Sequence, residues 1–175
     1  MDPLGRTEAL ECRTCGSRFD PRSIDPACPK CGGILEVVWE PRTPDVASLK
    51  APVDSMWAFL NLLPVADDHG VSTGEGGTPL ATAPALATET GVESVWIKDE
   101  GQNPTGSAVD REMALAMAVA TRIDGSHGSR AAAGAAGQSF AAYAARAGIE
   151  GSLYLPARAP FEAKAMANVH DIDLT

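Results

Sequence analysis

The second half of the chain alternates between short apolar runs and segments with apolar residues at helical spacing. Short apolar runs bounded by turn residues predict strands, and a spacing of three to four residues predicts amphipathic helices. Strands are predicted at 94–98, 130–133 and 152–155, helices at 107–121, 138–147 and 161–169, and a fourth strand from about 171. Strands and helices that alternate at these lengths indicate right-handed βαβ units on an open parallel sheet, an α/β fold.

Two of the predicted helices carry end signals. Ser107 is the expected N-cap of the first helix, and Asp110 three residues later makes a pattern like a capping box. Gly148 is the expected C-cap of the helix that ends at Ala147.

The front of the chain reads differently. Residues 1–40 are predicted to form a small separate module, and residues 41–70 a linker with a short helix at 55–64 that Pro64 ends. Glu40–Pro44 is the linker proper, with two prolines and no apolar period. The glycine-rich loop 72–80 opens the main domain, predicted over 71–175.

Composition narrows the function classes. The chain has 175 residues, 45% of them hydrophobic, and a net charge of −9. A negative field repels phosphate backbones and anionic membranes, so neither nucleic acid nor a membrane is an expected partner. There is no run of 18 apolar residues and no apolar leader at the N-terminus, so the expected compartment is the cytoplasm.

All four cysteines lie in the first 31 residues, as two C-x2-C pairs separated by 12 residues: Cys12, Cys15, Cys28 and Cys31. This spacing is typical of a tetrahedral zinc site, and four thiolates leave no open coordination position for catalysis. The sequence therefore predicts a zinc ribbon with structural zinc. Two disulfides or four free thiols are the alternatives, and a reducing cytoplasm disfavours the disulfides.

Two loops are expected at the carboxyl edge of the sheet, where such folds bind ligands. They are 99–107 and 134–139, and both run into helix N-termini, which attract anions. Asn103, Thr105 and Ser107 make the first loop polar. An anion site and plain helix capping are both open readings.

Several motifs together resemble one family. The entry loop Gly74-Glu75-Gly76-Gly77-Thr78-Pro79-Leu80, the segment 98–107 (KDEGQNPTGS) and the helix 137–148 (GQSFAAYAARAG) resemble threonine synthases, in that order along the chain. The cysteine ribbon also occurs at the front of many members. The resemblance covers Cys12 to about His170. It implies the pyridoxal-phosphate fold type II of tryptophan-synthase-beta-like enzymes, and conversion of O-phosphohomoserine and water to threonine and phosphate.

The same resemblance exposes three departures. The position of the lysine that forms a Schiff base with the cofactor is Val109, and the family's loop serine and asparagine positions are Ala132 and Ala135. The only lysines are Lys30, Lys50, Lys98 and Lys164, and none is expected to substitute. Family members are also about twice as long, so the α/β domain is expected to be truncated.

These departures predict a threonine-synthase-like protein without catalytic activity, which does not bind pyridoxal phosphate covalently. The alternative from another class is an interaction or regulatory module that docks on a full-length synthase or another protein. A third reading, in which a second polypeptide supplies the missing half and activity survives, is disfavoured because the lysine belongs to this half.

Overall fold

The computed structural model describes residues 4–23, 25–41, 54–66, 70–123 and 125–175. Three sheets are present within them: an N-terminal three-stranded sheet, a two-stranded sheet, and a three-stranded parallel sheet near the C-terminus. The predicted linker core at 42–44 lies outside the described residues, and the division of the chain at residues 40 and 70 stays a prediction.

The N-terminal sheet is antiparallel and holds the cysteines in its turns. Strand β1 (Thr7–Cys12) lies between β2 (Arg18–Phe19) and β3 (Leu35–Trp39). Each C-x2-C pair closes a tight turn, because the amide after the second cysteine donates to the carbonyl of the first: Gly16 to Cys12 at 2.9 Å and Gly32 to Cys28 at 2.8 Å.

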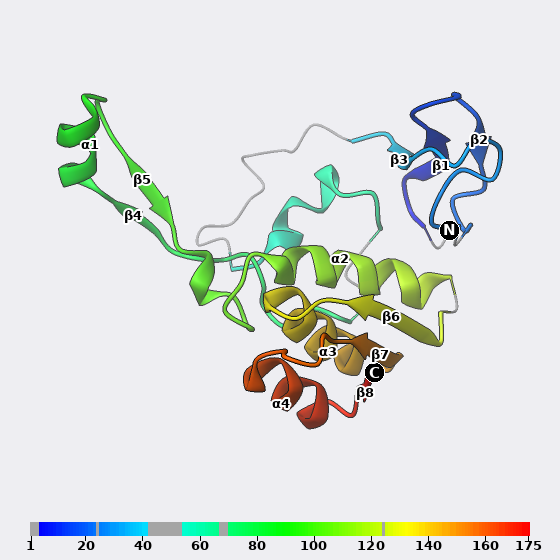
Figure 1. Cartoon of the computed structure of the whole chain (residues 1–175). Helices are drawn as coiled ribbons and strands as arrows, with labels where there is room; N and C mark the ends of the chain where they lie inside the picture. The colour runs from blue at the N-terminus through cyan, green and yellow to red at the C-terminus, as the bar shows by residue number, and fades with distance from the viewer. Residues whose placement is uncertain (1–3, 24, 42–53, 67–69, 124) are drawn as a thin grey trace.

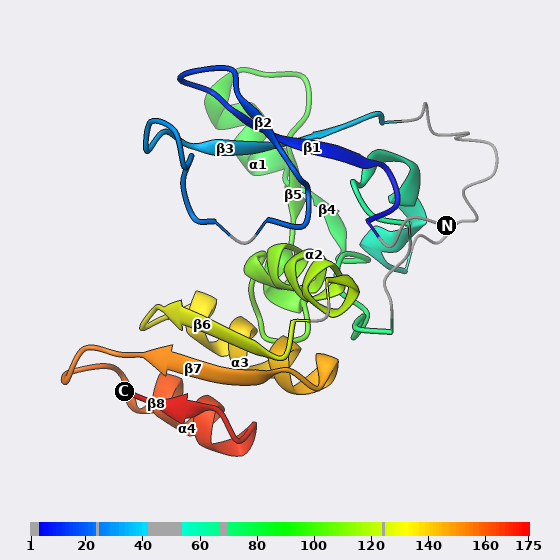
Figure 2. The same cartoon turned by 90° about the vertical axis from the view of Figure 1, so that its right-hand side faces the viewer.

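This module is anchored on the short helical segment that follows it. η2 (Met56–Leu62) is a 3-10 helix in the region where a short helix is predicted, and Ser55 caps it. Arg6 Nη1 donates to the Leu60 carbonyl at 3.1 Å, and Thr7 Oγ1 donates to the Pro64 carbonyl at 2.8 Å. The ribbon is thereby held over α2, as Figure 2 shows.

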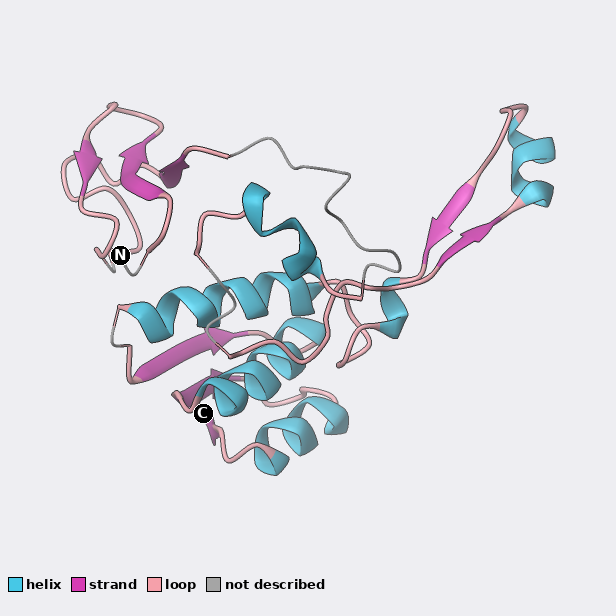
Figure 3. Cartoon of the chain, turned by 180° about the vertical axis from the view of Figure 1, so that it is seen from behind, coloured by secondary structure: helices cyan, strands magenta, loops and turns pink. Residues whose placement is uncertain are grey.

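The two-stranded sheet corrects one prediction. The predicted strand 94–98 exists as β5 (Trp96–Lys98), but it pairs antiparallel with β4 (Leu80–Thr82) and takes no part in the parallel sheet. Between them α1 (Pro84–Thr90) is only seven residues long, so the connection folds back as a hairpin. This β4–α1–β5 arm, residues 80–98, extends away from the rest of the chain (Figures 1 and 3).

The parallel sheet agrees with the predicted βαβ pattern. Its order is β6 (His127–Ala131), β7 (Glu150–Tyr154) and β8 (Asp173–Leu174), and the connections are α3 (Ala135–Ala147) and α4 (Phe161–Val169). α2 (Val109–Arg122) precedes β6 and packs on α3. Gly148 closes α3 in a left-handed conformation with φ of 68°, as predicted.

The main apolar core lies between α2, α3 and this sheet. Phe140, Tyr143 and Leu153 are among its buried residues, along with several alanines. Phe140 packs against the backbone of β7, and a Cβ added at Gly151 would come within 2.6 Å of the Ile172 side chain. Glycine at this position therefore permits the close approach of helix and strand. No described helix is long and apolar enough to cross a membrane.

Candidate functional site

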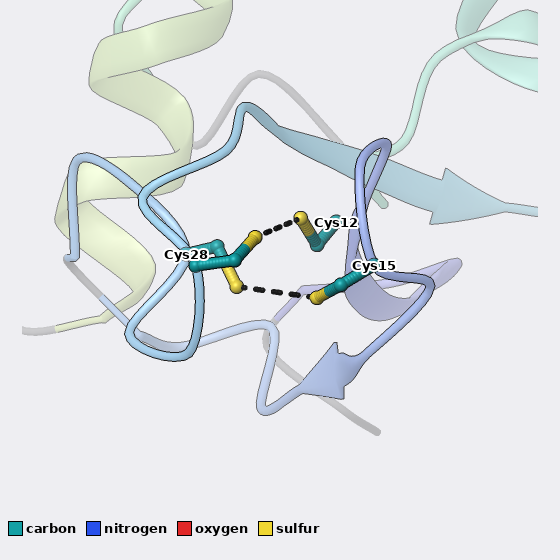
Figure 4. Close-up of side chains that lie close together, drawn as sticks. Cys12, Cys15 and Cys28 are labelled. Carbon is teal, nitrogen blue, oxygen red and sulfur yellow. Dashed lines mark hydrogen bonds between the residues drawn. The ribbon is translucent and has the colours of Figure 1, made fainter.

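The four cysteine sulfurs meet in one cluster at the end of the ribbon. All four lie within 4.8 Å of one another, with 3.5 Å between the Sγ atoms of Cys12 and Cys31 and 3.7 Å between those of Cys15 and Cys28 (Figure 4). Zinc–thiolate bonds of about 2.3 Å in a tetrahedron place sulfurs about 3.8 Å apart. The thiols are free rather than joined in disulfides, and their spacing fits a tetrahedral metal ion.

The electrostatics of the cluster favour thiolates. Hydrogen bonds from the side chain and backbone of Ser17 lower the pKa of Cys15 to about 6. A backbone hydrogen bond from Cys15 likewise lowers the pKa of Cys12. Because thiolate is the form that binds metal, the ribbon is prepared for a cation at neutral pH.

The second cluster lies where the arm meets α2. The Glu100 carboxylate accepts from Arg111 Nε and Nη2, each at 2.7 Å, from Thr78 Oγ1 at 2.8 Å and from Asn103 Nδ2 at 2.9 Å. Arg111 Nη2 also donates to the Gly76 carbonyl at 3.1 Å. The bidentate Arg111 pair lowers the pKa of Glu100 to about 2. This Glu100–Arg111 network ties the glycine-rich loop to the first turn of α2.

The polar residues of the loop before α2 are engaged within the protein. Asn103 is buried, and its Oδ1 accepts from the Gly76 amide at 3.0 Å. The buried Asp110 carboxylate accepts from the Thr105 amide at 2.7 Å and from the Thr105 hydroxyl. The predicted capping box is therefore wrong, because Asp110 reaches Thr105 rather than Ser107.

Ser107 still caps the helix, one residue before the position predicted. The first helical residue is Val109, and its amide donates to Ser107 Oγ at 3.2 Å. Capping is the role that the structure supports for Asn103, Thr105 and Ser107, since their described contacts are all internal. An anion site at this loop stays a prediction.

Val109 is half-buried at the start of α2 and packs against the main core. Ala132 lies in the turn after β6, and Ala135 is the first residue of α3. The start of α2 and the turn after β6 lie on the same side of the molecule (Figure 1). The three positions that the resemblance assigns to cofactor contacts are thus found at one edge of the domain, and all carry aliphatic side chains.

Sequence analysis missed a buried polar cluster around Glu75, whose side chain is fully buried. The Trp57 indole N–H donates to Glu75 Oε1, and Tyr143 OH and the Thr73 amide donate to Oε2 at 2.7 and 2.9 Å. Burial raises the pKa of Tyr143, as does its neighbouring carboxylate. A glutamate between glycines in an apolar domain was the available signal, but its partners are 18 and 68 residues away.

Comparison with known proteins places this geometry in a family. A family model described as "Pyridoxal-phosphate dependent enzyme" matches residues 71–173, which include the arm, the Glu100–Arg111 network and the parallel sheet. The chain belongs to the pyridoxal-phosphate-dependent enzymes. Within them, the similar curated proteins are threonine synthases, as the resemblance predicts.

The threonine synthase of Methanosarcina acetivorans is 35% identical over 150 residues, which are 85% of this chain and 37% of that protein. The enzyme of Methanocaldococcus jannaschii is 36% identical over 150 residues, or 83% of this chain and 37% of that protein. That of Mycobacterium leprae is 44% identical over 104 residues, or 57% and 28%. The chain therefore spans less than two-fifths of the length of these relatives.

Solved structures agree on the fold. A pyridoxal 5′-phosphate-dependent aspartate racemase aligns with a TM-score of 0.51 at 23% identity, over 56% of this chain and 31% of that chain. The processed form of threonine deaminase isoform 2 from Solanum lycopersicum aligns with a TM-score of 0.50 at 22% identity, over 56% and 27%. These matches show the α/β architecture of pyridoxal-phosphate enzymes and nothing about substrate.

The residues present do not fit a covalently held pyridoxal phosphate. A Schiff base requires an amine, and Val109 has none. Lys98 Nζ donates to the Thr78 carbonyl, and Lys164 Nζ contacts the Ala157 carbonyl at 3.4 Å. Lys30 lies in the ribbon, and Lys50 lies outside the described residues. No described lysine replaces the missing one at the start of α2.

Proposed function

We propose that this chain is a threonine-synthase-like protein that does not perform the Schiff-base chemistry of its relatives. The family reaction converts O-phosphohomoserine and water to threonine and phosphate, and its cofactor needs a lysine amine. The observation that carries the proposal is the half-buried valine at position 109, with its backbone held by Ser107. A side chain without a nitrogen neither attaches a cofactor nor transfers a proton.

The surroundings of this position support a loss confined to the chemistry. Ala132 and Ala135 leave the turn after β6 without the polar groups that the resemblance expects there. The Glu100–Arg111 network and the Glu75 cluster are nevertheless complete in their hydrogen bonds. The scaffold is kept while the three reactive or polar positions have become aliphatic.

We also propose that Cys12, Cys15, Cys28 and Cys31 hold one structural zinc ion. Four sulfurs at tetrahedral spacing support a closed site, which leaves no position for substrate. The ion would supply folding free energy to a module whose three strands are short and whose core is small.

The test is a titration of the zinc-loaded protein with pyridoxal phosphate, followed by absorbance. The threonine synthase of Methanosarcina acetivorans is the positive control. We expect the long-wavelength band of lysine-bound cofactor in the control and not in this chain, and no threonine formed from O-phosphohomoserine. A saturable band of equal height in this chain would refute the proposal.

A second candidate function is a module that docks on another protein. It is favoured by one observation, the exposed apolar residues of the β4–α1–β5 arm. The partners considered are a full-length synthase and a chain that supplies the rest of the fold.

A further inference from the structure

The β4–α1–β5 arm exposes more apolar surface than a free hairpin needs. Leu80 is 58% exposed, Val92 50%, Trp96 57% and Ile97 47%. Every residue of β4 and β5 is exposed, and the two strands have substantial contacts only with each other. Contiguous apolar surface of this kind marks an interaction site.

The arm is also incomplete as a sheet. β4 and β5 form a ladder that runs from Pro79 and Asp99 at its base to Ala83 and Val95 at its tip. The outer edge of each strand is unpaired among the described residues. A two-stranded hairpin is marginally stable in water, and an open edge is a template for a further strand.

One face of the hairpin is hollow. Trp96 and Thr82 are cross-strand partners, and with Ala87 of α1 and Val92 they line a 470 Å³ open cavity between helix and strands. Ile97 and Ala81 point to the opposite face. A partner that adds a strand to the edge would also bury the Trp96 or the Ile97 side chain.

The family match identifies what would cover this surface. The arm lies within the segment matched by the family model, so it belongs to the shared fold rather than to a private insertion. The relatives continue for about three-fifths of their length beyond the matched part. A second copy of the chain is the weaker occupant, because a net charge of −9 on each copy opposes self-association.

We infer that the arm docks, by strand addition, on a separate polypeptide that carries the remaining part of the synthase fold. This inference rests on membership of the family and on the exposed arm. It does not depend on the proposed loss of the Schiff base, so a failed docking test leaves that proposal untouched.

The docking test is co-expression of the full chain with the part of the Methanosarcina acetivorans synthase that follows its matched segment. We expect the two to co-purify as a 1:1 complex. Trp96→Lys and Ile97→Lys are expected to weaken the complex at least about tenfold, since a buried charge replaces an apolar anchor. The matched control is Phe161→Lys on α4, which changes a residue that is 79% exposed and outside the arm.

Three results would overturn the inference. They are equal binding by the arm and control variants, equally tight binding of the full-length relative, and self-association through the arm. A second measurement does not require the added fragment to fold. Amide hydrogen exchange of the chain alone should be fast over β4 and β5 and slow over β7, and a monomer equally protected in both would also overturn it.

Discussion

Replacing Glu100 by glutamine is predicted to destabilise the protein far more than the same replacement at Glu112. Both carboxylates pair with an arginine, and glutamine keeps the volume of the side chain. Glu100 makes a bidentate pair with Arg111 at 2.7 Å and has a side chain 26% exposed. Glu112 makes one 3.0 Å contact with Arg130 and has a side chain 59% exposed.

The magnitude follows from the pKa of Glu100. Hydrogen bonds from Arg111 lower that pKa from 4.5 to about 2. At 1.36 kcal/mol for each pKa unit, this difference corresponds to about 3.4 kcal/mol. Solvent screening of a group that is a quarter exposed reduces the expected loss to about 1–2 kcal/mol. Glu112→Gln should cost less than about 0.5 kcal/mol, as for other surface pairs.

The pH dependence gives this prediction a sign. Because folding depresses the pKa of Glu100, its stabilisation is complete above pH 4.5 and is lost as the pH falls toward 2. The stability gap between the wild type and Glu100→Gln should therefore shrink across this window. Release of zinc at low pH affects both proteins and cancels in the difference.

The assay is urea unfolding followed by tryptophan fluorescence, at pH 7 and at steps from 4.5 downward. A double-mutant cycle with Arg111→Gln should show a coupling of about 1 kcal/mol or more. Equal losses for Glu100→Gln and Glu112→Gln, or a gap that stays constant down to about pH 3, would refute the reasoning.

Three further predictions concern other parts of the fold. Gly76→Ala should cost at least about 2 kcal/mol more than Gly74→Ala in urea unfolding: both glycines have positive φ, but only at Gly76 would the new Cβ lie 2.5 Å from a backbone atom. Tyr143→Phe should cost about 1–3 kcal/mol in thermal or urea unfolding, since buried Glu75 loses a 2.7 Å donor, and an unchanged midpoint would contradict the role of that bond. Chelation of the metal, or Cys15→Ser, should unfold the β1–β3 module while the helical circular dichroism of α2–α4 persists, and joint loss of both would show that the ribbon is not a separate folding unit.

Local signals in the sequence predicted much of the α/β domain. α4 begins at Phe161 and ends at Val169 as predicted, because Pro160 fixes its start and its apolar residues recur at helical spacing. α3 ends at Gly148 as predicted, since glycine adopts the left-handed conformation readily. The cysteine cluster was equally predictable, because two identical short motifs fix two identical turns.

Contacts between distant residues were not predictable in this way. β5 reads as a strand from its composition, but nothing local shows that its partner is β4 rather than a parallel strand. Glu75 appears in a glycine-rich loop as a solvent-exposed charge, yet Trp57 and Tyr143 enclose it from other elements. Burial of a charge depends on which groups arrive from elsewhere, and a pattern of neighbours does not carry that information.

The candidate site divides along the same line. Its aliphatic positions, Val109, Ala132 and Ala135, were read from a resemblance, and the structure places them at one edge of the domain. The engagement of Thr105 with Asp110 was not foreseen, because a capping box two residues away matched the same letters.

Borohydride reduction in the presence of pyridoxal phosphate tests the central claim most directly. The chain has four lysines, so peptide mapping by mass spectrometry can assign any attachment to one of them. The account predicts, in the wild type, only low and unsaturable labelling, spread over exposed lysines and abolished by competing free lysine. Stoichiometric labelling of a single lysine would contradict it, because it would show that another amine has taken over the role lost at Val109.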